Sequence, residues 1–213
     1  MNTHRLPALI GSNPLGALAA FGLLRLLSED DPNARLSFVE ADDWLACIHT
    51  ERHPQLDDLL AWLHQQQGGA LPWLELWPGD DLRIQAQTFR EWQSEHLNDA
   101  ALQPWLSALA ADGAVDRQKG LIKPSAFYMV SGQMNFIAGL KDIRTALQSA
   151  SDDRHWREAL LGPWSYRTQA HSLGWDPAGE RLHALRHRAP TAEKATCIPG
   201  AIWLAAQALP WFP

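Results

Sequence analysis

Cysteine is scarce in this chain, and the motifs in which cysteine usually does chemistry are missing. The 213 residues contain only Cys47 and Cys197, and neither stands in a CxxC or other metal-type spacing. A disulfide framework is therefore not expected, and a zinc site has no support from the sequence. We expect both thiols to be reduced and buried in a cytoplasmic protein.

Long apolar runs are missing as well. The most apolar stretch, Leu15 to Leu27, has 13 residues, whereas a helix that crosses a bilayer needs about 20. Ser12-Asn13-Pro14 precedes this stretch, Arg25 lies inside it and acidic residues follow it. This arrangement predicts a buried helix that starts near Pro14, and neither a signal peptide nor a membrane segment is expected.

The sequence also lacks the common catalytic motifs. It has no glycine-rich phosphate loop, no HExxH and no aspartate-rich metal cluster. Ser131-Gly132-Gln133 resembles part of a nucleophile elbow, but Met129 stands where that motif needs its first glycine. A helix N-cap at Ser131 is the simpler interpretation. The sequence alone therefore predicts no enzyme and no cofactor.

What is present is a segregated charge. The formal net charge is −6, but the acidic residues dominate between Glu29 and Asp81, and the basic residues dominate between Arg117 and Lys194. Arg181, Arg186, Arg188 and Lys194 form the densest cationic run, which we call the basic strip. Because local clustering decides the field near a surface, the basic strip could attract a polyanion despite the acidic total.

Hydrophobic periodicity predicts a helix-rich α+β fold in one domain, residues 1–213, with a few short antiparallel strands and a subdivision near 113–122 as the alternative. Two strands, Ala34 to Val39 and Trp44 to His49, are expected to form a hairpin. The expected helices begin near Pro14, Pro54, Gln85, Ala100, Ser131, Asp152 and Pro199.

Two groups of residues are candidates for contact with nucleic acid. In the first, the basic strip binds phosphate while Trp175, in the WDP turn, stacks on a base. In the second, Lys123, Gln133 and Asn135 surround a helix N-terminus, whose free N–H groups favour an anion. The alternatives are ion pairs between the basic strip and the acidic N-terminal third, and ordinary polar capping of the helix.

A metal-dependent nuclease or hydrolase is a separate alternative. His183 and His187 have the i, i+4 spacing of metal ligands on a helix, and Asp176 and Glu180 are nearby carboxylates. No further histidine or carboxylate stands at a usual offset, and WDPAGE is typical of a turn with solvated carboxylates. Surface histidines among arginines are the favoured interpretation of the pattern.

Three blocks of the sequence resemble one family. NPLGALAAFGLLRLL near the N-terminus, KPSAFYMVSGQMNF in the middle and the block from Gly162 to the final PWFP are similar to the small proteins of type I-G (formerly I-U) CRISPR loci that are described as an extension of the helicase-nuclease. The blocks cover roughly half of the chain.

The resemblance implies a non-enzymatic accessory or adaptor subunit of a CRISPR–Cas antiviral system. Its expected partners are the effector complex and the helicase-nuclease, and guide RNA or target DNA through the basic strip. The apolar LPWFP end and the acidic N-terminal third leave another option open, a module that binds protein only.

Overall fold

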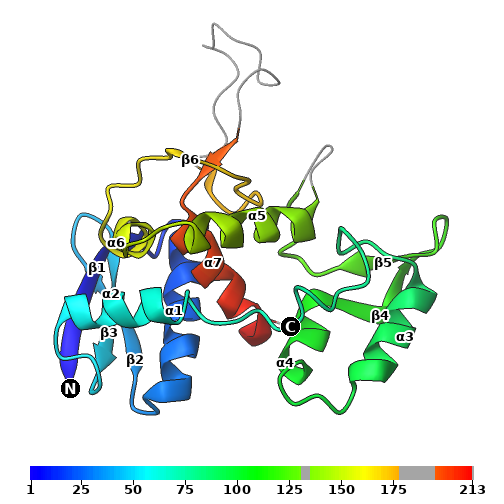
Figure 1. Ribbon diagram of the computed structural model, residues 1–213, viewed down its shortest axis with the longest axis horizontal. Coiled ribbons are helices and arrows are strands. Elements are labelled where there is room, and N and C mark those ends of the chain that lie inside the picture. The colour runs from blue at the N-terminus through cyan, green and yellow to red at the C-terminus, as the bar shows by residue number, and fades with distance from the viewer. Residues whose placement is uncertain (131–134, 178–194, 213) are drawn as a thin grey trace, which may run out of the picture.

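The computed structural model describes residues 1–130, 135–177 and 195–212, and it shows a helix-rich α+β fold, as predicted (Figure 1). One antiparallel sheet has the strand order β1-β3-β2, formed by Asn2–Ile10, Trp44–Thr50 and Arg35–Glu40. The predicted hairpin is confirmed as β2 and β3. β1 was not predicted, because its inward positions include the polar His4 and its pairing shifts register between Leu6 and Ile10.

The core is centred on two helices, α1 (Pro14–Asp30) and α7 (Pro199–Ala208). Every residue of α7 is buried. The two helices approach so closely that a Cβ atom added to Gly22 of α1 would lie 1.7 Å from the carbonyl oxygen of Leu204 in α7. The apolar stretch from Leu15 to Leu27 is thus an internal helix, as its sequence predicted.

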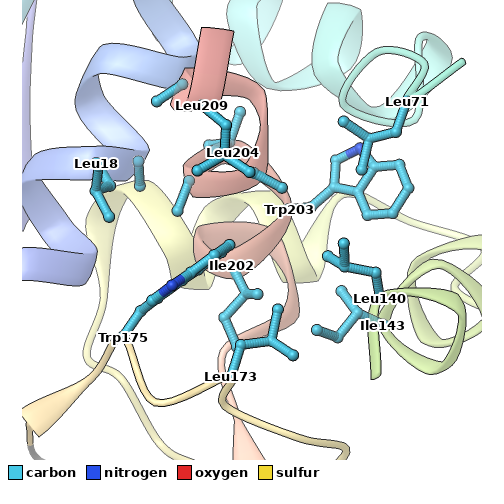
Figure 2. Close-up of a cluster of buried hydrophobic side chains, with 14 of the residues drawn as sticks. Leu18, Leu71, Leu140, Ile143, Leu173, Trp175, Ile202, Trp203, Leu204 and Leu209 are labelled. Atoms are coloured by element: carbon cyan, nitrogen blue, oxygen red, sulfur yellow. The ribbon is translucent and has the colours of Figure 1, made fainter. Parts of the chain in front are cut away.

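Shorter elements surround this pair. They are α2 (Leu56–Gln65), α5 (Phe136–Gln148), α6 (Arg154–Leu161) and the short paired strands β6 (Thr168–Gln169) and β7 (Thr196–Cys197). Figure 2 shows α7 in the middle of this packing, with Leu18 of α1 on one side and Leu140 and Ile143 of α5 on the other.

A second group of elements lies to the right of α7 in Figure 1. It consists of α3 (Ala86–His96), α4 (Gln103–Leu109), β4 (Ala110–Asp116) and β5 (Leu121–Pro124). Its interior is aromatic, with ring centroids 5.0–6.3 Å apart among Trp73, Trp77, Phe89, Trp92 and Trp105.

One expectation for this group was wrong. The helix expected to begin near Ala100 begins at Gln103, and it is short because the chain turns at Ala110 into β4. Residues 113–122, where the sequence offered a subdivision as an alternative, lie in the β4–β5 hairpin, in which Val115 pairs with Ile122.

The last described residues fold back onto the protein. Leu209–Trp211 form a short 3-10 helix, η4. The ring of Phe212 packs edge-on against Phe21 of α1 and at a tilt against Phe127, with ring centroids 5.6 Å apart in both pairs. Among the residues that the structure describes, no helix combines the length and the apolar character needed to cross a membrane.

Candidate interaction site

Residues 13–27, 123–136 and 162–213, the three sequence blocks described above, contribute to one apolar pocket. It has a volume of about 260 Å³. The first block contributes one wall from α1, the middle block contributes Phe127 and Met129, and the last block contributes Trp175 and Phe212. We call it the apolar pocket; its lining residues on α1 are Pro14, Ala17, Leu18 and Phe21.

The sequence of α1 sets the first wall of the apolar pocket. Asn13 caps the helix, with its Oδ1 accepting hydrogen bonds from the N–H groups of Leu15 at 2.9 Å and Gly16 at 3.2 Å. Pro14 can occupy the first turn because a helix leaves that N–H unpaired. The cap thus fixes where α1 begins and turns Ala17 and Phe21 toward the pocket.

The other walls are fixed by Trp175. The residue is 1% exposed, and the centroid of its ring lies 5.8 Å from that of Phe136. Its indole N–H donates to the carbonyl oxygen of Phe127 at 2.8 Å. The prediction that Trp175 stacks on a base is therefore wrong, because the ring is buried inside the protein, where it joins the last block to the middle block.

Asp176 is buried as well, and not solvated as the WDP pattern suggested. It is 2% exposed, and its carboxylate accepts hydrogen bonds from the Tyr166 hydroxyl at 2.6 Å and from the Asn13 side-chain amide at 3.5 Å. Burial, followed by the hydrogen bond to Asp176, raises the pKa of Tyr166 well above its usual value. Asp176 therefore ties the WDP turn to the cap of α1, which is a structural role.

The rim of the apolar pocket contains side chains that solvent reaches. Met129 is 53% exposed, and Trp211, next to the pocket residue Phe212, is 44% exposed. Flexible thioether and aromatic side chains at the edge of an apolar hollow are typical of surfaces that bind other proteins. All the lining side chains are alkyl, aromatic or thioether groups, so the pocket offers burial and dispersion to a ligand.

The helix N-terminus predicted to bind an anion from a nucleic acid, at the start of α5, already contacts a carboxylate of this chain. The N–H of Phe136, in the first turn of α5, donates to Oδ1 of Asp81 at 3.3 Å, and the Tyr128 hydroxyl donates to Oδ2 of the same residue at 2.7 Å. The helix N-terminus attracts an anion, as predicted, but the anion is the chain's own carboxylate. A phosphate there would meet a like charge.

The described residues of that predicted group do not share a site. Lys123 is exposed on β5 and lines a neighbouring hollow of about 460 Å³, which shares Phe127 and Phe212 with the apolar pocket. Asn135 is exposed at the start of α5, and its side chain makes no capping hydrogen bond.

Several predicted residues lie outside the described part of the chain. They are the basic strip (Arg181, Arg186, Arg188 and Lys194), together with Gln133, Ser131, Glu180, His183 and His187. Within residues 1–130, 135–177 and 195–212, no group of three or more His, Cys, Asp or Glu side chains could hold a metal ion. The nuclease alternative therefore stays a prediction.

Sequence analysis did not find the apolar pocket as a unit. Each block contributes only two to four residues to it, and the blocks lie far apart in the chain. No family model, no curated protein and no solved structure matches this chain.

Proposed function

We propose that this chain is a non-enzymatic accessory subunit of a type I-G CRISPR–Cas antiviral system. It acts in the cytoplasm by docking onto the effector complex or the helicase-nuclease, and it contacts guide RNA or target DNA through the basic strip. The observation that carries this proposal is the meeting of the three resembling blocks around the apolar pocket. A partner side chain that enters the pocket would bury apolar surface, which favours association by about 25 cal/mol per Å².

The lining of the apolar pocket is suited to binding a partner and not to catalysis. Alkyl and aromatic groups cannot transfer protons or bind a metal, so the pocket can supply binding energy and shape only. Its walls are held in place from behind by the Trp175–Phe127 hydrogen bond and by the Asn13 cap. A pocket that is formed before the partner arrives loses little conformational entropy on binding.

The test is co-purification. The tagged chain is expressed with type I-G effector and helicase-nuclease proteins, and the extract is treated with nuclease before capture. Met129→Glu places a charge at the edge of the apolar pocket, on a residue that is 53% exposed and therefore tolerates the change. We expect this variant to retain less than about one tenth of the captured partner, because burying an unpaired carboxylate costs more than 1.4 kcal/mol.

Leu97→Glu is the matched control, since Leu97 is 57% exposed and follows α3 in the other group of elements. It should capture as much partner as the unmodified chain. Equal capture by Met129→Glu would rule out the apolar pocket as the docking site. Failure of the unmodified chain to capture either partner would contradict the proposed function itself.

A further inference from the structure

Another hollow lies where the end of α5, one face of α6 and the segment before β6 meet. It shares no residue with the apolar pocket. Its volume is about 740 Å³. We call it the α6 pocket. Its polar and charged lining residues are Ser149, Arg154, His155, Arg157, Glu158, Ser165, Arg167 and Thr168.

Three arginines and one carboxylate line this pocket. The arginines differ in how closely they pair with carboxylates of the protein. Arg157 is held by Asp57 at 2.9 Å and by Asp153 at 3.0 Å. Arg154 has only a loose contact with Asp152, at 3.7 Å. Arg167 is exposed and has no carboxylate partner among the described residues. Arg167, and then Arg154, are thus the cations available to a ligand.

The carboxylates around the α6 pocket do not exclude an anion. Glu158 turns its Oε1 toward Ser165, where it accepts hydrogen bonds from the backbone N–H at 2.8 Å and from the hydroxyl at 2.5 Å. Asp57 and Asp152 are 81% and 59% exposed in their ion pairs. Exposed pairs of this kind contribute at most about 1 kcal/mol, so a phosphate can compete for the arginines.

His155 adds a hydrogen-bonding ring to the α6 pocket. The residue is only 9% exposed, it lines the α6 pocket, and its ring has no hydrogen-bond partner among the described residues. Burial, and then the neighbouring Arg154, lower the pKa of His155, so the ring is neutral and offers one N–H donor. The ring nitrogens are not among the fully buried unpaired atoms of the described residues, so a ligand in the α6 pocket can replace water as their partner.

The position of β6 indicates the kind of ligand. Thr168 of β6 lines the α6 pocket and pairs with Cys197 of β7. In the sequence, the basic strip lies between β6 and β7, and Lys194 stands two residues before Thr196 of β7. The α6 pocket is thus lined by one of the two strands between which the basic strip lies in the sequence. A ligand with many phosphates could use both cationic sites, whereas a small phosphate would use the pocket alone.

We propose that the α6 pocket binds a backbone phosphate of a single-stranded nucleic acid, with Arg167 and Arg154 as its cationic ligands and His155 as a hydrogen-bond donor. Guanidinium groups pair with phosphate oxygens through parallel N–H bonds. The pocket is concave, and a single strand can bend a phosphate into it more readily than a stiff duplex can. This inference rests on the nucleic-acid contact that the proposed function includes.

The test is a salt titration of binding. The probe is fluorescein-labelled oligo(dT) or oligo(U) of about 20 nucleotides, long enough for one binding site, and anisotropy is measured from low to physiological salt. Each phosphate contact on a single strand contributes about 0.7 to the slope of log K against log salt. We expect Arg167→Ala to weaken binding about fivefold and to reduce the slope by about 0.7, and Arg154→Ala/Arg167→Ala to reduce it by about 1.4.

Arg90→Ala is the matched control, because Arg90 is an exposed arginine of α3 without a carboxylate partner among the described residues. It removes the same charge far from the α6 pocket and should leave the slope unchanged. An unchanged slope in the double variant, or an equal loss in Arg90→Ala, would overturn the proposal. So would binding of inorganic phosphate or of a duplex at the affinity of the single strand.

The two proposals fail separately. Loss of oligonucleotide binding in Arg186→Ala/Arg188→Ala, with full binding in Arg154→Ala/Arg167→Ala, would assign the contact to the basic strip and overturn the inference about the α6 pocket. Partner capture is measured after nuclease treatment, so neither result changes the docking experiment with Met129→Glu.

Discussion

Asp31, at the C-terminal end of α1, shows how a single carboxylate can organise a corner of the protein. It is 2% exposed, and its oxygens accept hydrogen bonds from the Thr50 hydroxyl at 2.8 Å and from the N–H groups of Glu51 at 2.6 Å and Asn33 at 3.1 Å. Burial alone raises the pKa of Asp31, but these hydrogen bonds outweigh burial and hold the pKa below its usual value.

This arrangement predicts a specific dependence of stability on pH. A carboxyl group whose pKa is lower in the folded state stabilises the fold above its unfolded pKa of about 3.9, and this contribution is lost as the pH falls through the folded pKa. Asp31→Asn should lower the free energy of unfolding at pH 7 by about 2 kcal/mol, because an amide N–H would face the existing donors. Urea unfolding at a series of pH values measures this change.

The difference between Asp31→Asn and the unmodified chain should narrow below about pH 4. Asp42→Asn is the control, because Asp42 is exposed in the β2–β3 turn. It should change stability little at any pH. A difference for Asp31→Asn that stayed constant from neutral to acid pH would show that the lost contribution does not depend on charge.

At the scale of elements, the contact of α1 with α7 should be the most sensitive to a small added side chain. Gly22→Ala would place a methyl group 1.7 Å from the Leu204 carbonyl oxygen, so the two helices must separate. We expect a loss of at least about 3 kcal/mol in the free energy of unfolding, measured by thermal or urea denaturation. Gly113→Ala is the control, since a Cβ atom on Gly113 meets nothing within 4 Å; equal effects would contradict the helix contact.

The elements also show what the sequence could predict and what it could not. α1, α7 and the β2–β3 hairpin were predictable because local signals agree: Asn13-Pro14 before an apolar run, and two apolar strands around an acidic turn. β4 was not, because AADGAVD has low strand propensity and forms a strand only through its partner β5.

The candidate site was predictable only in part, for the same physical reason. The blocks could be recognised one at a time, but the burial of Trp175 and Asp176 depends on Phe127 and Asn13, which lie far away in the chain. A WDP sequence next to a basic strip is compatible with an exposed turn and with a buried one. Only the tertiary contacts decide between them.

At the scale of the whole molecule, the two cysteines test whether the protein opens as one unit. Cys47 lies in β3 and Cys197 in β7, and both are free and buried. Burial, and then the Glu158 carboxylate, raise the pKa of Cys197 to about 12. We expect neither thiol to react with an aromatic disulfide reagent at pH 8 in the native protein, and both to react in urea.

If the protein unfolds cooperatively, Cys47→Ala and Cys197→Ala should expose their remaining thiols at the same rate in mild denaturant. Absorbance of the released thiolate measures both rates. Faster labelling of Cys197 would show that the β6–β7 pair opens separately from the β1-β3-β2 sheet. That outcome would contradict cooperative unfolding.

The polar contacts of α7 have a consequence for comparing this chain with distant relatives. The buried Gln207 accepts a hydrogen bond from Arg25 at 3.0 Å, and its side-chain amide donates to the carbonyl oxygens of Gly68 and Ala70, both at 3.1 Å. Loss of either partner leaves a polar group unpaired in the interior. Substitutions at 25 and 207 should therefore occur together during evolution, and this paired change would identify the same helix packing in sequences that have diverged elsewhere.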